Sequence, residues 1–519
     1  MANAVITAPN YDQISASGQL KQYYNKIKMQ QLVMEHFPAV GIVPKDEGLQ
    51  GLNWKQPFAF AVNPNRSATF TIAQQPWFYA ATAAGPGNSV QSNASITTVG
   101  YPQVGAFIVT PVQDYGTAAI SRMTKKLSET SEGGFIEAAT EAMSMSMKAV
   151  MLSLGGAIYG DGTGTIGMLA SPQPTITGGG SLSVAGPLAL ANPNHIVNFY
   201  VGQVICFTAP TSSAPFTGGL LRGGGAPGDT LSAGVALGQG GGAMIVAIDR
   251  NRGYITFGTA PAANGNPANA VALSTLVPSV VLGDYLVQVG DASSAQSLSN
   301  GGDVAAGQSL KLSGFTTWVP SAPPTPGNLL FGVDTSSDTM LSGCLLNAVG
   351  LEIEEAIMEG AALGARQGAK LDTCFLDYSL WVALQFALTA RRIYTTATDS
   401  KVYSADGSVG YNSIKIEGGT GLIDVIPDPF AANASFVAGQ SSILLLQKDT
   451  WSLKTVGKAI SPFDVTGNAV DPSNPSDESV LLRAPTSDGY EFRCGMYGNM
   501  SCNAPGWNVN ILIGTPNTI

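Results

Sequence analysis

Histidine, the residue used most often in acid–base catalysis, is scarce in this chain. The only histidines are His36 and His195. A Ser–His–Asp triad would have to use one of them, and neither stands near a nucleophile-elbow sequence. We therefore expect both to be surface or structural residues and predict that the protein is not an enzyme.

The cysteines show neither metal-ligand nor disulfide-framework spacing. They are Cys206, Cys344, Cys374, Cys494 and Cys502. No CxxC pair is present, so we predict no metal site and no cofactor. An odd, scattered set favours buried free thiols, although the nearest pair, Cys494 and Cys502, could face each other across a short hairpin. The glycine-rich loops lack the Gly-Lys-Ser/Thr sequence of a phosphate-binding loop.

Several carboxylates invite a catalytic interpretation that their context does not support. Asp161-Gly-Thr-Gly has a different order from the aspartic-protease signature. Asp249, Asp284 and Trp318 are the residues that a carbohydrate-binding or hydrolytic protein would recruit for an acidic pair and an aromatic platform. A further carboxylate set, which we interpret as a solvated or inter-subunit helix face, is Glu352, Glu354, Glu355 and Glu359. Arg391-Arg392 suits the negative end of a helix.

Composition indicates a β-rich protein that hides much of its surface in contacts. The 519 residues include 62 glycines, 45% are hydrophobic and only 12% are charged. A soluble monomer usually carries about twice that share of charge. With a net charge of −10 and no Lys/Arg run, tight wrapping of nucleic acid is not expected. No apolar run of about 18 residues predicts a membrane span, and we expect no secretory signal.

A long helix followed by a glycine-rich loop is the clearest local pattern. Apolar residues recur at helical spacing from Phe135 to Leu154. We expect this helix to stop near Gly155-Gly156 and the sequence from Tyr159 to Gly164 to form turns with positive φ angles.

Strands and shorter helices are predicted on both sides of this helix. A helix over Leu20–Phe37 should end at Pro38. Strands are predicted over 52–62 and 68–72, with Pro57, Pro64 and Pro76 breaking the runs, and a further strand is predicted within 98–111. Between Ser171 and Pro320 the strand candidates are 196–207, 244–257 and 279–289, which together predict a small β-barrel or sandwich. Later helices are predicted over 351–367 and 379–392, and later strands over 371–376, 414–416, 421–426, 442–447, 451–455, 490–497 and 507–513.

The order of these motifs resembles that of tailed-bacteriophage major capsid proteins. The similar segments are LGGAIYGDGTGTIGM at the end of the long helix, GFTTWVPSAPPTPGNLLFGVDTSSDTMLSG from Gly314 to Gly343, GAKLDTCFLDYSLWVALQFAL from Gly368 to Leu388, and YEFRCGMYGNMSCNAPGWN from Tyr490 to Asn508. This resemblance covers nearly the whole chain outside the predicted insertion. Each segment alone is a packing or turn signature, and their joint order carries the resemblance.

The resemblance implies an α+β protein of the Hong Kong 97-type fold with an inserted small β domain. It places an N-terminal arm at 1–48 and an extended hairpin loop at 49–104. A peripheral domain takes 105–170 and 315–367, with a spine helix over 129–154. The inserted β domain takes 171–314, and the axial domain with the C-terminal strands takes 368–519.

The implied function is a major capsid protein that forms hexamers and pentamers of the icosahedral head of a tailed phage. The partners would be other copies of the chain, with portal, scaffolding and decoration proteins, and with double-stranded DNA as enclosed content and no membrane. The location would be the virion capsid, assembled in the bacterial host cytoplasm.

Some relatives crosslink a hairpin lysine, but Lys55, the only lysine in this hairpin, lies near its base, so crosslinking is not expected. The short arm favours a separate scaffolding protein or none.

Three other functions are open from the residues. An encapsulin-like nanocompartment shell would share the fold. A β-rich carbohydrate-binding or hydrolytic protein would use the carboxylates named above. A phage tail or fibre protein would usually show repeats, and the chain has none.

Overall fold

The structure is a computed structural model. It describes residues 36–48, 51, 53–61, 103–123, 138–173, 182, 185–209, 222, 242–259, 270–291, 310–324, 326, 329–336, 338–392, 414–419, 421–437, 439–457, 460–463, 481–483 and 489–514. The predicted strand over 68–72, most of the predicted helix over 20–37, and the glycine-rich stretch 223–241 lie outside these residues. Among the described residues, no helix has the length and apolar character that a membrane crossing requires.

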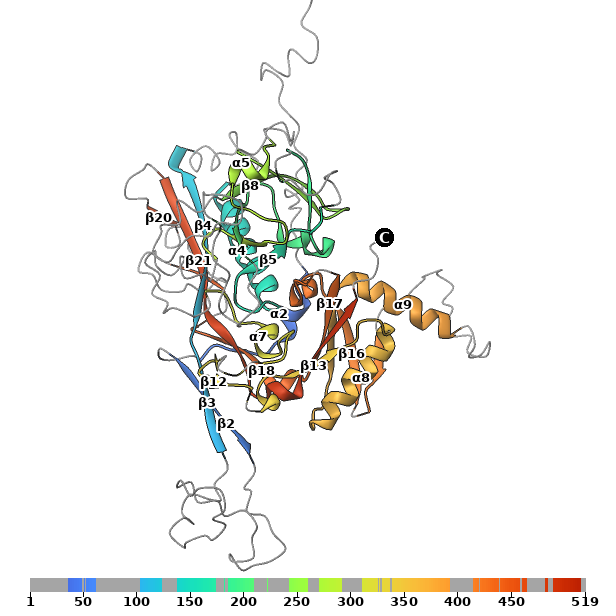
Figure 1. Cartoon of the computed structure of the whole chain (residues 1–519). Coiled ribbons are helices and arrows are strands. Elements are labelled where there is room, and N and C mark those ends of the chain that lie inside the picture. Colours follow the sequence, from blue (N-terminus) through green and yellow to red (C-terminus); the bar gives the residue numbers. More distant parts are fainter. Residues whose placement is uncertain are drawn as a thin grey trace, which may run out of the picture. The chain divides into compact units, whose positions relative to one another are not determined.

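The chain is a mixed α+β protein of two compact units (Figure 1). The smaller unit takes its described residues from Gly116–Ala149 and Pro462–Cys494. The larger takes them from His36–Tyr115, Val150–Ser461 and Gly495–Ile519. In the smaller unit, β20 (Leu481–Arg483) pairs antiparallel with the start of β21 (Gly489–Cys502), and the Cys494 thiol lies 3.5 Å from the Ser146 hydroxyl.

A six-stranded mixed sheet with helices on one face dominates the larger unit. Its strand order is β13-β22-β17-β14-β16-β15. The bounds are β13 Cys344–Asn347, β14 Thr373–Leu376, β15 Ile414–Glu417, β16 Leu422–Pro427, β17 Gln440–Leu446 and β22 Val509–Gly514. β13 runs parallel to β22 and β14 parallel to β16, whereas the remaining neighbours are antiparallel. The predicted strands over 371–376, 414–416, 421–426, 442–447 and 507–513 are confirmed to within two residues at their ends.

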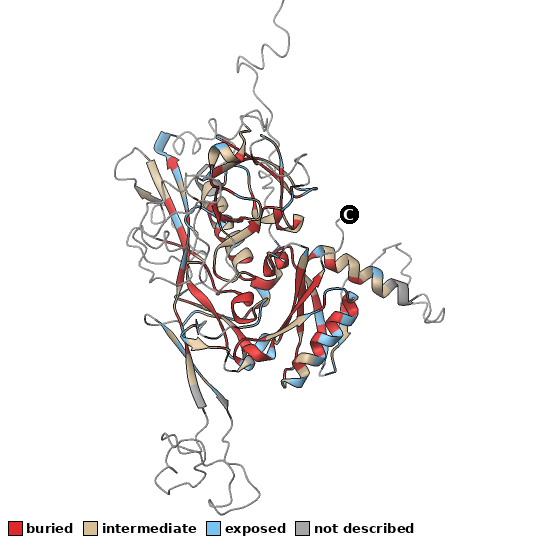
Figure 2. Cartoon of the chain, in the orientation of Figure 1, coloured by how far each residue is buried: buried red, intermediate tan, exposed pale blue. Residues whose placement is uncertain are grey.

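Helices α8 (Ile353–Arg366) and α9 (Tyr378–Arg392), which were both predicted from their apolar spacing, cover one face of this sheet. Alternate strand residues such as Cys374, Ile443 and Ile511 join them in one buried cluster. The residues of the opposite pleat are also buried, because the sheet has protein on both faces (Figure 2). On that second face the Phe375 ring stacks on the Phe315 ring at 5.9 Å.

A second six-stranded sheet follows the long helix, in the order β5-β10-β7-β8-β9-β6. Its strands are β5 Thr165–Met168, β6 Leu188–Ala189, β7 Val204–Thr208, β8 Ala243–Asp249, β9 Tyr254–Gly258 and β10 Tyr285–Gln288. The two end strands also meet, because the Ala170 amide donates to the Ala189 carbonyl and the Ala191 amide to the Met168 carbonyl. Phe199, Phe207 and Phe257 fill its interior.

A two-stranded ribbon and a further sheet complete the larger unit. β2 (Trp54–Ala61) pairs antiparallel with β3 (Gln103–Val109). β1 (Lys45–Asp46) runs parallel to β18 (Trp451–Thr455), which pairs antiparallel with the end of β21. β4 (Val112–Ser121) also pairs with β21. The other elements are α2 Pro38–Ile42, η3 Pro193–Asn198, α5 Leu273–Leu276, α7 Phe315–Trp318, β11 Leu329–Leu330, β12 Val333–Asp334, η7 Thr339–Leu341, η8 Ala431–Ala434, η9 Lys448–Thr450, β19 Ser461–Pro462 and η10 Pro505–Trp507.

The long helix α4 spans Ala138–Ala157, so its predicted stop near Gly155-Gly156 is confirmed to within one residue. Both glycines lie in its last turn, where other segments approach closely. A Cβ on Gly155 would lie 2.8 Å from the Phe37 ring, and one on Gly156 would lie 3.2 Å from the Asn433 amide nitrogen. These glycines therefore serve packing, whereas the predicted turns do follow at Gly162 and Gly164, which have φ angles of 85° and 81°. The predicted start near Glu129 lies outside the described residues.

Prolines and a capping asparagine account for three further differences. Pro38 begins α2 where it was predicted to end a helix, because its fixed φ suits a first helical position. Pro57 lies within β2, where a ribbon strand has one unpaired edge. The predicted strand over 196–207 is wrong in its first half, because the Asn192 side chain accepts from the Asn194 amide at 3.0 Å and starts η3.

Candidate functional site

The three residues considered for carbohydrate chemistry each have a structural role. The Asp284 carboxylate is buried and accepts from the Arg222 Nε at 2.7 Å. The Trp318 indole is buried and donates to the Met500 carbonyl at 3.2 Å. Asp249 accepts from the Asn251 amide in a turn at 3.0 Å. An acidic pair beside an exposed aromatic platform is therefore not formed by these residues.

The other candidate groups are also engaged in local structure. The Asp161 carboxylate accepts from both the amide and the hydroxyl of Thr163, which closes the turn after α4. All five cysteines are free, and Cys494 and Cys502 lie on the same strand, so the hairpin interpretation is wrong. Burial raises the pKa of Cys206 to about 11 and that of Cys502 to about 12, which keeps these thiols protonated.

The acidic set on α8 divides into two environments. Glu352, Glu355 and Glu359 are exposed, whereas Glu354 is buried, so the predicted single solvated face is wrong for Glu354. Lys55 is exposed on β2 opposite Ile108. α9 ends at Arg392, and the side chains of Arg391 and Arg392 lie outside the described part. Nowhere in the described residues do three or more His, Cys, Asp or Glu side chains gather as around a metal ion.

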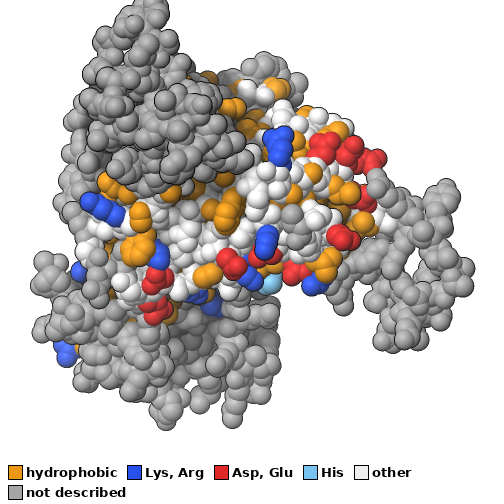
Figure 3. All heavy atoms as spheres, turned by 90° about the horizontal axis from the view of Figure 1, so that it is seen from below, with side chains coloured by type: hydrophobic (Ala, Val, Ile, Leu, Met, Phe, Trp, Pro, Cys, Tyr) orange, Lys and Arg blue, Asp and Glu red, His pale blue; other side chains and the backbone are white. Residues whose placement is uncertain are grey.

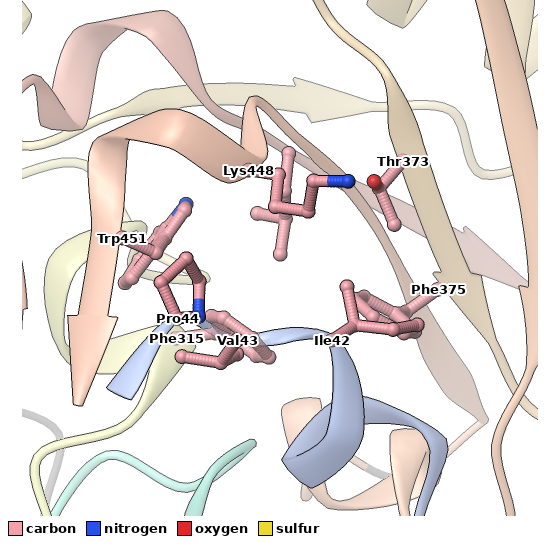
Figure 4. A pocket seen from close by; sticks show the side chains of 9 residues that line it. Ile42, Val43, Pro44, Phe315, Thr373, Phe375, Lys448 and Trp451 are labelled. Carbon is pink, nitrogen blue, oxygen red and sulfur yellow. The ribbon is translucent and has the colours of Figure 1, made fainter. Parts of the chain in front are cut away.

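A small cavity lies where the segment after α2 meets the mixed sheet (Figure 4). Its lining includes Val43, Phe315, Phe375, Leu446 and Trp451. The cavity volume is ≈ 10 Å³, about what a single water molecule requires. It is therefore a packing gap between three segments and too small for an organic substrate.

The best-developed constellation in the larger unit is a junction around the C-terminal end of α4. We define the junction by Phe37, the last turn of α4, Asn198, Lys311 and Phe430. The Phe37 ring stacks on the Phe430 ring at 5.9 Å, above the bare backbone of Gly155. The Ala39 amide at the start of α2 donates to the Asp428 carboxylate at 3.1 Å. The segment that follows residue 35 is thereby held to both α4 and the loop before η8.

A pair of side-chain amides joins the second sheet to the junction. Asn198 donates to the Asn433 side-chain oxygen at 2.7 Å, and Asn433 donates back to Asn198 at 3.1 Å. The Asn198 amide also donates to the Ile166 carbonyl at 2.8 Å, and the Asn433 amide reaches the Gly156 carbonyl at 3.4 Å. Any displacement between η3, η8 and the end of α4 would break this reciprocal pair.

A buried ion cluster lies on the other side of the same helix end. The Lys311 ammonium lies 3.0 Å from the carboxylates of both Asp114 and Asp291 and 2.8 Å from the Ser153 hydroxyl. Burial raises the pKa of Asp291, and the attraction of Lys311 opposes this shift only in part. Burial lowers the pKa of Lys311, but the two carboxylates outweigh it and hold the pKa above its usual value. The Lys311 ammonium therefore links Asp114 on β4, Ser153 on α4 and Asp291.

Aromatic packing fills the space between the junction and the mixed sheet. The Phe315 ring meets the rings of Tyr159, Phe375 and Trp451 with centroid distances of 5.5, 5.9 and 4.8 Å. The Phe315 amide donates to the Ile158 carbonyl at 2.7 Å, and a Cβ on the preceding Gly314 would collide with the Ile158 and Ala157 carbonyl oxygens. The chain that returns after the second sheet is thus held directly against the end of α4.

The junction residues were not predicted individually from the sequence. Lys311 and Asp291 lie among small polar residues with no periodic pattern, and their partners are distant in the chain. The one available signal was the scarcity of charge, which makes a lone lysine between two glycine-rich stretches unusual. His195 was predicted to be structural or on the surface, and the structure places it in the buried alternative, with Nε2 3.0 Å from the Ala432 carbonyl.

Burial of His195 predicts a specific pH dependence of stability. Desolvation lowers the pKa of His195 to about 4 from 6.5. Below pH 6.5 the His195 imidazole is protonated in the unfolded chain, whereas in the folded chain it stays neutral until the pH approaches about 4. The free energy of unfolding therefore falls as the pH drops from 6.5 toward about 4. Between about pH 7 and about pH 5 we expect His195 to cost about 2 kcal/mol. His195→Gln, which can still donate to Ala432, should lack this component when urea unfolding of the unassembled chain is measured at both pH values. Equal pH dependence in both proteins would contradict a neutral buried imidazole.

No family model matches this chain, and no curated protein matches it. Among solved structures, the chain is similar to the capsid of cyanophage A-1(L), with 7% identity, 96% of this chain and 98% of that chain covered, and a TM-score of 0.44. It is similar to the capsid of a native GTA particle, with 8% identity, 98% and 100% covered, and a TM-score of 0.39. The encapsulin of Synechococcus elongatus PCC 7942 matches 35% of this chain and 58% of its own, with 10% identity and a TM-score of 0.20. The first two of these solved chains are covered over almost their full length, whereas the encapsulin is covered over little more than half.

Proposed function

We propose that this chain is the major capsid protein of a tailed phage, with a Hong Kong 97-type fold. The observation that carries the proposal is the order of elements along the chain. A ribbon precedes a long helix, a self-contained β sheet follows that helix, and a helix-covered mixed sheet comes after it. This is the order that the sequence motifs imply, and it is built around a junction that holds segments together without any catalytic constellation among the described residues.

The proposed fold divides the chain into the following domains. The arm takes 1–48, and β2 and β3 form the base of the extended hairpin over 49–104. α4 is the spine helix of a peripheral domain over 105–170 and 315–367, and the axial domain takes 368–519. The inserted domain takes 171–314, and the hydrogen bonds between the end strands of the second sheet support its assignment as a small barrel. β5 (Thr165–Met168) pairs with β10 of this sheet, which supports moving the start of the barrel from Ser171 to Thr165.

The role of the protein would be assembly and not catalysis. Many copies would form hexamers and pentamers of a closed head in the virion, with double-stranded DNA as enclosed content. Portal, scaffolding and decoration proteins would be further partners. Assembly would take place in the cytoplasm of a bacterial host. A shell subunit needs a rigid body that transmits contact forces, and the junction supplies one through the ion cluster, the paired amides and the aromatic packing.

The ribbon offers a specific physical reason for contact between copies. Along β2, Lys55, Pro57 and Ala59 are exposed, and Trp54 and Phe58 are only half-buried. The opposite face of the ribbon is already buried, because Gln56, Phe107 and Val109 pack against the rest of the chain. Docking on a neighbouring subunit would bury the exposed face, and each further contact would form at high effective concentration.

Electron microscopy with light scattering of the purified chain tests the proposal. We expect regular closed shells or capsomer rings, alone or with a co-expressed scaffolding protein. An encapsulin-like compartment would give shells that contain cargo protein and never package DNA, so the contents separate these two assembled forms. A chain that stays monomeric under all these conditions would overturn the proposal and favour the β-rich binding class.

A further inference from the structure

The outer face of α8 carries charge of opposite sign at its two ends. Most of the described surface visible in Figure 3 is hydrophobic or uncharged, and the charged side chains gather in a few groups. On α8 the exposed positions include Glu355 and Glu359 toward the N-terminal end and Arg366 at the C-terminal end. Lys370, also exposed, follows just beyond Arg366. With a rise of about 1.5 Å per residue, Glu355 and Arg366 are separated by roughly 16 Å.

These charges are not neutralised within the described part of the subunit. None of Glu355, Glu359, Arg366 and Lys370 forms an ion pair with another described residue. The two ends are farther apart than the Debye length of about 8 Å at physiological salt, so each acts on a partner as a separate charged spot. Between them, Met358 has 56% of its side chain exposed, although it lies in the middle of the helix.

The helix dipole explains part of this pattern but not all of it. Carboxylates near the N-terminus and cations near the C-terminus stabilise a helix by about 0.3–1 kcal/mol each. That effect requires neither an exposed methionine between the charges nor Lys370, which lies beyond the helix. The acidic end of this surface is complementary in charge to the basic end of the same surface on a second copy, so two copies placed head to tail attract each other.

We propose that the outer face of α8 binds a second copy of this chain head to tail, with Glu355 and Glu359 of one copy facing Arg366 and Lys370 of the next. This inference rests on the proposed shell function and names the surface that would join neighbours within a ring. A head-to-tail contact uses two different patches, so it repeats around a closed ring.

Two charge-reversal variants test the contact. One is Glu355→Lys with Glu359→Lys, and the other is Arg366→Glu with Lys370→Glu. Each variant alone places like charges across every contact and should lose assembly. In an equimolar mixture, subunits that alternate around the ring restore opposite charges at every contact. Rings with an even number of subunits should therefore reappear, whereas five-membered rings cannot alternate and closed shells should stay rare.

Controls separate folding from assembly. A control of equal charge change, Glu47→Lys with Asp449→Lys, alters two exposed carboxylates on other segments and should assemble normally. Circular dichroism and thermal unfolding of each variant must show a folded chain, because reversed charges also oppose the helix dipole. If the unsubstituted chain forms no assembly, the proposed function fails. If it assembles and the two folded variants either assemble alone or fail to rescue each other, the head-to-tail contact alone is wrong.

Discussion

Replacing Lys311 with Met should cost up to about 3–5 kcal/mol of stability, because it leaves two largely buried carboxylates without their cation. The Asp114 and Asp291 carboxylates both lie 3.0 Å from the ammonium group, and the Lys311 side chain is only 10% exposed. The Ser153 hydroxyl that donates to Asp114 at 2.5 Å cannot replace a positive charge. Urea unfolding of the unassembled chain measures this loss directly.

An exposed ion pair of the same type provides the matched control. Lys415 lies 2.9 Å from Asp424, but both side chains are more than half exposed. Lys415→Met should therefore change the free energy of unfolding by no more than about 1 kcal/mol. Equal effects of the two substitutions would contradict the clamping role of Lys311.

The two carboxylates of the cluster should not be equivalent. Because burial raises the pKa of Asp291, ionising it costs free energy in the folded state. The stability that protonated Asp291 contributes is present at low pH and is lost as the pH rises through its folded pKa. Asp291→Asn should thus be tolerated at neutral pH. As the pH falls, the free energy of unfolding of the unsubstituted chain should rise relative to that of the Asp291→Asn variant. Adding Asp114→Asn and Asp291→Asn to Lys311→Met should recover much of the lost stability, because no unpaired charge remains buried.

Phe315→Ala should be as damaging as the loss of Lys311, for a different reason. The ring is fully buried and touches Tyr159, Phe375 and Trp451 from three parts of the chain. Truncating a buried phenylalanine removes its transfer free energy and leaves a cavity, at a cost of about 3–5 kcal/mol. We expect the midpoint of urea unfolding to fall accordingly.

Phe386 on α9 is the natural comparison, because 68% of its side chain is exposed. Phe386→Ala should alter the stability of the isolated chain by no more than about 0.5 kcal/mol. If Phe315→Ala proved as mild as this, the junction would be softer than its aromatic packing indicates, and a rigid link between the end of α4 and the mixed sheet could not be maintained.

Periodic patterns account for what the sequence determined by itself. Apolar spacing located α8 and α9, and apolar runs bounded by turn residues located most strands of the mixed sheet to within two residues. Glycines that need positive φ angles identified the turns at Gly162 and Gly164. The order of motifs was also sufficient to establish the resemblance on which the proposed function depends. These features are local, so each can be read from a short window of the chain.

Only the tertiary structure decided which segments the junction brings together. Gly155 and Gly156 were predicted correctly as the end region of the helix, but only the structure shows that Phe37 and Asn433 lie close against them. Lys311 becomes a clamp only because Asp114 and Asp291 reach the same point, and Glu354 is buried while the neighbouring Glu352 and Glu355 are exposed. The physical reason is that burial and ion pairing depend on contacts between residues far apart in the chain, and no local propensity encodes such contacts.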